Sequence, residues 1–405
     1  MKLLFLTHRL PYAPNRGDRI RSYHLLRALA ARHEVRLVSL VHDAEEQRHV
    51  SDLNGMLAGV EVRHVRRWRN LARVPTKLPS PAPLTHVLLD ADLKPLLQTH
   101  VSRHRPDLVV AYCSGMASLA LEPPLSDIPF VLDMVDVDSE KWRTLGACTR
   151  GPRGWVYRRE AERLARFETD ATRKAFATTI VNERERQSLS DLAPGADIRI
   201  VANGIDTAAF RPPGPQAGEP RVVFTGVFNY QPNEEAAVWL AERVWPLVRR
   251  SQPQARLTLV GANPTARVQR LTRVDASIEV TGTVPQVQPY LWQAAVAAAP
   301  LATARGVQNK VLEAIAAGLP AVVTPVVYAG LPAVAAPACI VASDPTEFSA
   351  AILQLLGLTA DERRARAERA DLSSLSWPAQ LAPFLELILE AGASPATTET
   401  PRPRQ

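Results

Sequence analysis

Short apolar runs alternate with longer segments of helical periodicity along most of this chain. The runs in its first half have the length of buried strands, and they cover residues 3–7, 35–41, 60–65, 108–112, 130–132, 178–181 and 198–201. The segments between them place apolar residues on one helical face, as Ile20, Tyr23 and Leu26 do. This alternation predicts βαβ units around a parallel sheet.

The alternation starts again after residue 220. The second set of apolar runs covers residues 222–225, 257–260, 278–280, 294–299, 321–324 and 339–341. Between the two sets lies the sequence RPPGPQAGEP, whose four prolines and two glycines cannot continue a helix or a strand. We therefore predict an α/β chain of two doubly wound, Rossmann-like domains joined by a linker.

The same pattern gives the domain boundaries. We expect an N-terminal domain over residues 1–210, a linker over 211–220 and a second domain over 221–372. Residues 373–392 have helical periodicity and are expected to form a C-terminal helix that packs back across the domains. The tail, residues 393–405, has little to bury and is expected to be disordered.

The composition is that of a folded globular protein. Hydrophobic residues make up 46% of the 405 residues and charged ones 22%, which excludes a disordered scaffold. The three cysteines are far apart, so neither a disulfide framework nor a zinc site is expected. The first apolar run is too short for a signal-peptide core, and no run of about 18 apolar residues is present. We expect a cytoplasmic protein without a spanning helix.

The charge is uneven along the chain. The whole +7 excess lies in the first 200 residues, and arginine supplies 42 of the 48 basic residues, which a GC-rich genome would also explain. Residues 63–77 carry six basic side chains and no acidic one, and residues 141–174 carry ten against four. Because Trp68, Trp142 and Trp155 lie among these cations, we expect peripheral contact with an anionic membrane surface. The chain has no nucleic-acid-binding motif, so nucleic acid is not an expected partner.

Two segments of the first half carry candidate chemistry. Gly17 lies in the loop after the first strand, where free N–H groups at a helix start can hold an anion. The sequence FVLDMVDVDSEKW presents Asp133, Asp136 and Asp138 at the end of a predicted strand, where a catalytic base would lie in this architecture. The alternative for Asp138 is a helix N-cap. The carboxylates match no metal-ligand pattern, so no metal is expected.

Three loops of the second half end strands in small residues. Gly226 and Asn229 follow the first strand, Gly261 follows the second, and Thr283 and Val284 follow the third. A strand, a glycine turn and a helix start form the usual phosphate-binding arrangement at a sheet crevice. Together these loops indicate one wall of a nucleotide site.

The most informative segment is residues 299–324. A loop carrying Arg305, Gly306, Gln308 and Asn309 leads into a helix with Lys310 and Glu313 on about the same face. Lys310 is the only lysine after residue 200, and an ammonium near a helix start suits a diphosphate. Glu313, one turn later, could accept the hydroxyls of a ribose. The alternative is an ordinary surface ion pair.

The chain resembles the retaining GT-B glycosyltransferases of family 4. The resemblance covers nearly the whole chain and rests on RLPYAPNRGDRIRSYHLLRAL, NGIDTAAFRP, FTGVFNYQPNEEAAVWL, VTGTVPQVQPYL and GVQNKVLEAIAAGLPAVVT. The N-terminal block, LDMVDVDSEKW and GVQNKVLEA are together similar to sugar transferases of bacterial exosortase and exopolysaccharide systems.

The resemblance implies two domains facing a central cleft, and transfer of a sugar from a nucleotide-diphosphate donor to a hydroxyl of a lipid-linked glycan. Glu313 corresponds to the second glutamate of the family's E-x7-E motif and would hold the donor ribose. Lys310 and the loop before it would contact the diphosphate or the sugar, residues 281–284 would pack on the nucleobase, and Gly17 would approach the phosphates.

This chain departs from the family pattern at two places. Arg305 stands where the first glutamate of E-x7-E is expected, and Asn229 and Tyr230 replace the usual Arg and Lys after the second domain's first strand. Neutralisation of the diphosphate would then fall to other cations, with Arg305, Lys310, Arg9 and Arg16 as candidates.

Fixed cations and helix N-termini would stabilise the departing diphosphate without a metal or another cofactor. On the acceptor side Asp136 is the first candidate to orient or deprotonate the nucleophile, Asp138 the second and His8 the third. Two other functions fit the same architecture. One is a nucleotide-sugar epimerase, and the other is a non-catalytic protein that binds a nucleotide sugar or a glycan.

Overall fold

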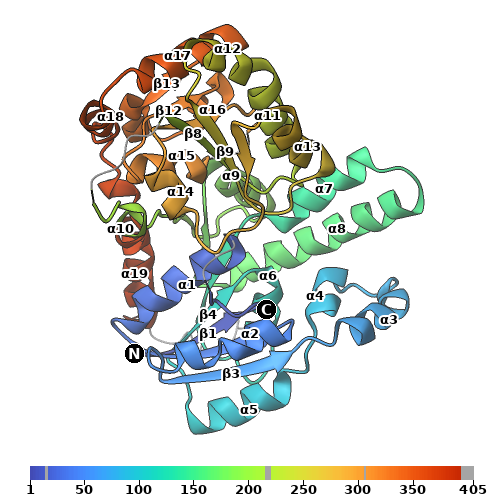
Figure 1. The fold of residues 1–405 in the computed structure, drawn as a ribbon. Helices are drawn as coiled ribbons and strands as arrows, with labels where there is room; N and C mark the ends of the chain where they lie inside the picture. The colour runs from blue at the N-terminus through green and yellow to red at the C-terminus, as the bar shows by residue number, and fades with distance from the viewer. Residues whose placement is uncertain (14–16, 215–219, 305–306, 394–405) are drawn as a thin grey trace. The chain divides into compact units, whose positions relative to one another are not determined.

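The computed structural model describes residues 1–13, 17–214, 220–304 and 307–393 of the chain. It divides into two compact units (Figure 1). Unit 1 comprises Met1–Gly204 and the chain from Gln380, and unit 2 comprises Ile205–Ala379. Each unit is built around one parallel sheet. Among the described residues, no helix combines the length and apolar character needed to cross a membrane.

Unit 1 contains a seven-stranded sheet in the order β3-β2-β1-β4-β5-β6-β7. Its strands are β1 (Lys2–Thr7), β2 (Glu34–Val41), β3 (Gly59–His64), β4 (Leu108–Tyr112), β5 (Phe130–Val135), β6 (Ala177–Ile180) and β7 (Ile198–Ile200). All neighbouring pairs are parallel. The strand order reverses between β1 and β4, which makes that point the topological switch, where such sheets bind ligands.

The helices of unit 1 are α1 (Gly17–Ala30), α2 (Ala44–Arg48), α3 (Arg67–Lys77), α4 (Leu84–Leu89), α5 (Lys94–Arg103), α6 (Ser114–Ala120), α7 (Asp138–Cys148), α8 (Gly151–Lys174) and α9 (Glu183–Leu192). A short 3-10 turn, Ser51–Leu53, precedes β3. Helices α7 and α8 form a hairpin (Figure 1). They touch closely at Gly146, where a Cβ would lie 2.9 Å from the Arg158 side chain.

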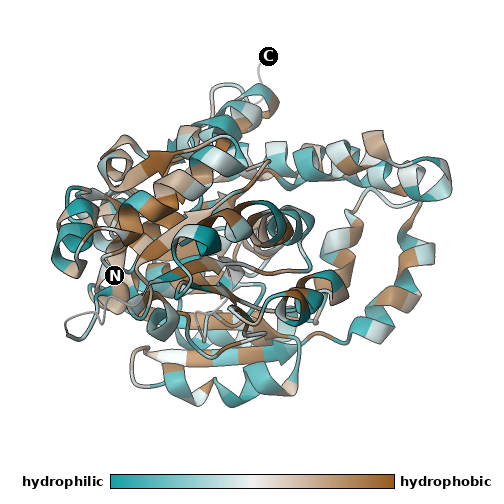
Figure 2. Cartoon of the chain, turned by 45° about the horizontal axis from the view of Figure 1, so that its top comes forward, coloured by the Kyte–Doolittle hydropathy of each residue, from teal (hydrophilic) through white to brown (hydrophobic). Residues whose placement is uncertain are grey.

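Unit 2 contains a six-stranded sheet in the order β10-β9-β8-β11-β12-β13. Its strands are β8 (Arg221–Thr225), β9 (Arg256–Val260), β10 (Ile278–Val280), β11 (Val296–Ala299), β12 (Ala321–Val323) and β13 (Cys339–Val341). Figure 2 shows that the strands are apolar, as expected for sheets buried on both faces. The order reverses between β8 and β11, so these two strands flank the switch point of this unit.

The helices of unit 2 are α10 (Thr207–Phe210), α11 (Gln231–Trp239), α12 (Trp245–Ser251), α13 (Ala266–Val274), α14 (Gln288–Trp292), α15 (Asn309–Ala316), α16 (Pro325–Ala329), α17 (Pro345–Leu356) and α18 (Ala360–Ala367). One π-helical turn, Leu240–Val244, joins α11 to α12, and 3-10 turns cover Ala333–Ala338 and Ser373–Leu375. The last helix, α19 (Trp377–Ala393), begins in unit 2 and continues into unit 1.

A buried ion pair holds unit 1 together at the carboxyl ends of its strands. Arg21 of α1 donates from Nε and Nη2 to the two carboxylate oxygens of Asp133 on β5, each at 2.8 Å. Thr179 of β6 donates to the same carboxylate at 2.7 Å, and Arg21 Nη1 donates to Asn203 Oδ1 at 3.0 Å. Arg21 and Asp133 are only 1% and 0% exposed, so both charges are removed from water. The bidentate hydrogen bonds between them offset that desolvation cost.

In unit 2 the loops after β8 and β9 lie in direct backbone contact. Gly261 has a φ of +150°, and a Cβ there would lie 1.7 Å from the carbonyl oxygen of Gly226. Phe228 N donates to Ala262 O at 2.8 Å, which closes the same contact. Only glycine fits at position 261, because another side chain would push the two loops apart.

Replacing one partner of the buried pair should destabilise unit 1 severely. Arg21→Met leaves the Asp133 carboxylate buried without its cation, which typically costs about 3–5 kcal/mol. The midpoint of urea unfolding measures the loss. Arg105→Ala, which breaks an exposed pair with Asp127, is the control and should cost at most about 1 kcal/mol. Equal losses in the two variants would contradict the structural role assigned to Arg21.

Gly261→Ala should destabilise unit 2 by roughly 3 kcal/mol or more, because its Cβ overlaps backbone that cannot move aside. Gly282 is the matched control, since it has a φ of +68° with open space around its Cβ position. Gly282→Ala should therefore cost only about 1 kcal/mol. Thermal unfolding of both variants separates loop overlap from backbone strain.

Candidate active site

The switch point of unit 2 holds a lysine in an unusual setting. Lys310 is the second residue of α15, the helix that follows β11. Its Nζ donates to Asn233 Oδ1 at 2.7 Å and lies 4.8 Å from the centre of the Phe224 ring. Asn233 belongs to α11, which follows β8, so one hydrogen bond links the two helices on either side of the reversal.

Partial burial makes this lysine easier to deprotonate than an exposed one. Desolvation lowers the pKa of Lys310 to about 8, against the opposing effect of the Glu313 carboxylate. Burial also raises the pKa of Glu313, and the Lys310 charge opposes that change. Within the described part of the chain no ion pair joins the two side chains, and Lys310 is bound to Asn233 instead. The arrangement therefore differs from a solvent-exposed surface pair.

Asn233 organises this site, although the sequence predicted no individual role for it within the loop and helix start after Gly226. It is 8% exposed, and its Nδ2 donates to Val227 O at 3.0 Å while its Oδ1 accepts from Lys310. The amide also lies 3.0 Å from the Cβ position of Gly226, so a larger residue at 226 would displace it. Its position in the first turn of a helix after a glycine loop was the available signal.

The structure describes two of the four predicted loop residues before Lys310. Gln308 is the N-cap residue of α15, and Asn309 is the exposed first residue of that helix. Arg305 and Gly306 lie outside the described residues. The predictions for those two therefore stay predictions.

The three small-residue loops of unit 2 do come together. Gly226 contacts Gly261, and Gly261 N donates to Thr281 Oγ1 at 3.3 Å. Asn229 and Thr283 have exposed side chains, and Val284 is half-buried against the core. The Gly226 carbonyl beside Gly261 explains that glycine, and the Asn233 amide beside Gly226 explains the other, so neither glycine requires a phosphate.

In unit 1 the end of β5 has a strained backbone. Val135 has a φ of +71°, which a β-branched residue rarely adopts, and the pairing with β6 shifts register there. The next residue, Asp136, has an exposed side chain. Strain of this kind is maintained only where surrounding contacts enforce it, and it often accompanies functional sites.

Helix α7 starts directly after this turn. The N-cap residue is Val137 and Asp138 is the first helical residue, so the alternative prediction of Asp138 as an N-cap is wrong. The Asp138 carboxylate instead lies 3.5 Å from Ser114 Oγ. Asp133 is separated from this group, because the strand directs it into the buried pair with Arg21.

Two further carboxylates lie at the start of α7, and both were missed. Glu185 of α9 accepts from Val137 N at 2.9 Å, and Glu168 of α8 accepts from Ser139 N at 3.2 Å. They replace the missing cap by accepting the free N–H groups of the first turn. No local sequence signal marks them, since each comes from a different helix far along the chain.

These charges affect one another. Desolvation, followed by the charges of Glu185 and Asp138, raises the pKa of Asp136 above its ordinary value. Desolvation also raises the pKa of Asp138. Burial raises the pKa of Glu168 to about 7, with the Asp138 charge contributing. Carboxylates with raised pKa values are suited to accept a proton from a hydroxyl.

The other first-half candidates have structural partners. The His8 ring stacks on Tyr112 with centroids 5.8 Å apart, and His42 Nε2 donates to the His8 carbonyl at 2.8 Å. Arg9 lies 3.1 Å from the buried carboxylate of Glu46, so its charge is partly neutralised. Gly17 is the first residue of α1. Arg16 lies outside the described residues.

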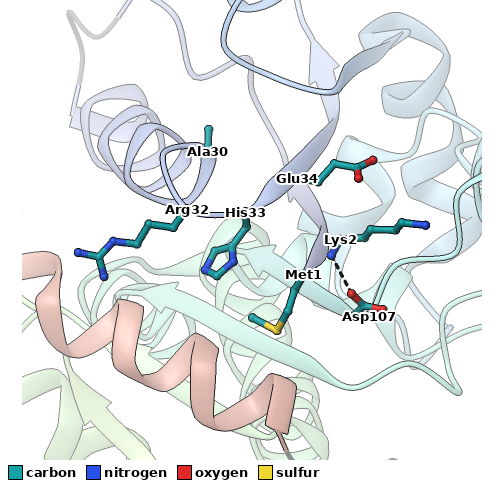
Figure 3. Close-up of a pocket in the computed structure, with 7 residues that line it drawn as sticks. All are labelled: Met1, Lys2, Ala30, Arg32, His33, Glu34 and Asp107. Carbon is teal, nitrogen blue, oxygen red and sulfur yellow. Dashed lines mark hydrogen bonds between the residues drawn. The ribbon is translucent and has the colours of Figure 1, made fainter.

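An open pocket lies at the amino ends of strands in the unit 1 sheet, opposite the carboxyl ends that carry the candidate residues (Figure 3). It surrounds the starts of β1, β2 and β4, where Lys2 N donates to Asp107 Oδ2 at 2.7 Å. Doubly wound sheets bind ligands at the carboxyl ends of their strands, so this pocket is not a candidate active site. Across the residues that the structure describes, no three His, Cys, Asp or Glu side chains are grouped as metal ligands.

Two family models match the chain, one in each half. Residues 17–204 match the glycosyl transferase 4-like domain, and residues 219–357 match the glycosyl transferases group 1 model. No curated protein is significantly similar in sequence.

Several solved structures share the fold of this chain. The Anabaena protein Alr3699/HepE in complex with UDP is 14% identical, with a TM-score of 0.62 over 96% of this chain and 100% of that one. WaaG, a glycosyltransferase involved in lipopolysaccharide biosynthesis, is 19% identical, with a TM-score of 0.59 over 94% and 98%. The α,α-trehalose 6-phosphate synthase from Burkholderia multivorans is 14% identical, with a TM-score of 0.57 over 97% and 99%.

These similarities and the two parallel sheets confirm the predicted fold class. The chain belongs to the GT-B glycosyltransferases of the group 1 and family 4 type.

Proposed function

We propose that this glycosyltransferase moves a sugar from a nucleotide-diphosphate donor to a hydroxyl of a lipid-linked glycan, with retention of anomeric configuration and without a metal. The observation that carries the proposal is the half-buried Lys310, which Asn233 holds at the switch point of unit 2. A fixed cation at a helix start is the group that a departing diphosphate requires.

The proposed donor is a nucleoside diphosphate sugar. Structures of the similar Anabaena protein were obtained with UDP, with UDP and glucose, and with UDP-glucose. In the present chain Glu313 follows Lys310 by one helical turn, and its carboxylate would accept the ribose hydroxyls. The loop after β10, with Thr283 and Val284, would contact the base.

Lys310 would stabilise the negative charge that develops on the leaving diphosphate. The first N–H groups of α15 would add to this stabilisation, because they point toward an anion at the helix start. Asn233 positions the ammonium through its 2.7 Å hydrogen bond. These groups would supply the role that a metal has in other transferases, so the proposed reaction needs none.

Asp136 is the proposed acceptor-side carboxylate, and Asp138 is the second choice. The exposed side chain and raised pKa of Asp136 support this order, because a catalytic base needs both access and affinity for a proton. Glu168 and Glu185 would act indirectly, since their charges and contacts fix the start of α7.

We place the reaction at the cytoplasmic face of a membrane, in exopolysaccharide or other cell-surface glycan synthesis of the type associated with exosortase systems. The sequence resemblance supports this setting. So does the similarity to WaaG, which is involved in lipopolysaccharide biosynthesis.

A nucleotide-release assay with and without a membrane extract as acceptor source separates the alternatives. A transferase releases nucleoside diphosphate faster when acceptor is present. An epimerase converts the donor without acceptor, and a binding protein shows donor affinity without turnover. Mass spectrometry of the products from a panel of nucleotide sugars would then identify the sugar.

Lys310→Ala and Glu313→Ala should each reduce transfer by roughly two to three orders of magnitude, because each removes a contact to the donor. Nucleotide release measures the loss, and circular dichroism checks that the fold is intact. Glu347→Ala, in the first turn of α17, is the control and should retain activity. Near wild-type turnover in either donor-site variant would remove that residue from the proposed site.

The reaction should lose donor affinity as the pH rises through about 8, because Lys310 then becomes neutral. Asn233→Asp places a carboxylate beside the ammonium, which favours its charged form and should move this alkaline limit to higher pH. Profiles of kcat/KM against pH for both proteins test this. An unchanged limit in Asn233→Asp would mean that another group titrates.

A further inference from the structure

Helix α3 presents its apolar face away from the protein. One side of this helix carries the apolar residues Trp68, Leu71, Ala72 and Pro75. All four are exposed. Trp68 is 75% exposed and Leu71 is 51% exposed. In a soluble protein this stripe would ordinarily face the core, so its orientation calls for a partner.

The opposite side of α3, which carries Asn70, Arg73 and Val74, packs on the protein. Asn70 is buried, and its Nδ2 donates to Leu88 O at 3.0 Å and to Asp90 O at 2.7 Å. Arg73 pairs with the Asp90 carboxylate. These bonds fix the rotation of the helix, so the outward position of Trp68 follows from the inward bonds of Asn70.

Cations flank the apolar stripe. Arg67 and Arg69 project on its two sides, Arg66 precedes the helix, and all three side chains are exposed. No acidic residue occurs between positions 63 and 77. This arrangement is complementary to an anionic bilayer surface. The apolar strip can enter the boundary of the acyl chains, and the arginines beside it can bind the lipid phosphates.

The end of α3 is held by a buried charged pair on α8. Arg159 donates to the carbonyls of Leu78 at 2.7 Å and of Ser80 at 2.6 Å. Its neighbour Glu160 accepts from the backbone N–H groups of Leu84 and Thr85, each at 2.8 Å. The segment between α3 and α4 is thereby fixed to a long rigid helix.

We propose that α3 is a lipid-docking helix, whose Trp68–Pro75 face enters the headgroup region of an anionic bilayer while Arg66, Arg67 and Arg69 bind lipid phosphates. A second copy packed on this face would bring like charges together. A nucleic acid would leave the apolar stripe unused. The proposal names a surface for the membrane setting in the proposed function, but its test needs neither donor nor acceptor.

Co-sedimentation with vesicles tests the proposal. The whole chain should bind vesicles that contain about a third phosphatidylglycerol, bind pure phosphatidylcholine weakly, and dissociate as salt is raised. Arg67→Glu with Arg69→Glu should lower the partition coefficient by roughly tenfold or more. Trp68→Ser with Leu71→Ser should lower it by roughly fivefold or more, because both side chains leave the interface.

The matched control is Arg32→Glu with Arg103→Glu, which makes the same change in net charge at exposed positions elsewhere in unit 1. Its partition coefficient should change far less. Equal losses in control and α3 variants would overturn the proposal, as would no binding of the wild type to anionic vesicles. A shift from dimer to monomer in the α3 variants would assign the face to a second copy. Binding of an oligonucleotide without vesicle binding would assign it to nucleic acid.

Activity on a detergent-solubilised acceptor keeps the two proposals separate. The α3 variants should retain it, since they alter no group of the proposed active site. Vesicle binding without any transfer would leave the docking surface in place while rejecting the proposed function.

Discussion

Unit 1 depends on the burial of one charged pair. Once Asp133 lies inside the sheet, its carboxylate must be paired, and Arg21 is the cation that reaches it. That requirement keeps α1, β5 and β6 together and draws in Asn203 beyond β7. The strained turn at Val135 follows two residues after this anchor. The pair therefore fixes the backbone from which Asp136 projects.

Unit 2 uses a smaller device at the corresponding place. In both units a polar side chain of the helix after the first strand binds a charged group on the other side of the strand reversal. In unit 1, Arg21 of α1 binds the Asp133 carboxylate. In unit 2, Asn233 of α11 binds the Lys310 ammonium. The difference lies in charge balance. Arg21 is ion-paired with a carboxylate, whereas Lys310 is hydrogen-bonded to the neutral amide of Asn233. The first arrangement stabilises structure, and the second leaves an ammonium whose charge is available to a ligand.

The parallel sheets were predictable because strands buried on both faces read as continuous apolar runs. Strand β4 (Leu108–Tyr112) and most of β8 (Arg221–Thr225) are such runs. Lys310 could be singled out because it departs from the arginine usage around it, whereas its hydrogen bond to Asn233, 77 residues away, could not be predicted. Asp133 was grouped with Asp136 because sequence spacing does not reveal that a partner 112 residues away will bury it. Glu168 and Glu185 were missed for the same reason, and the outward rotation of α3 depends on Asn70 finding carbonyls in another segment.

The altered lysine has a consequence for binding thermodynamics. Near pH 8 about half of the unliganded molecules hold Lys310 without its proton. An anion that settles beside it favours the charged form, so binding draws a proton from the solvent. The observed enthalpy of association would then include the ionisation heat of whichever buffer supplies that proton. Affinity measured in this range would report protonation and ligand contact as one linked process.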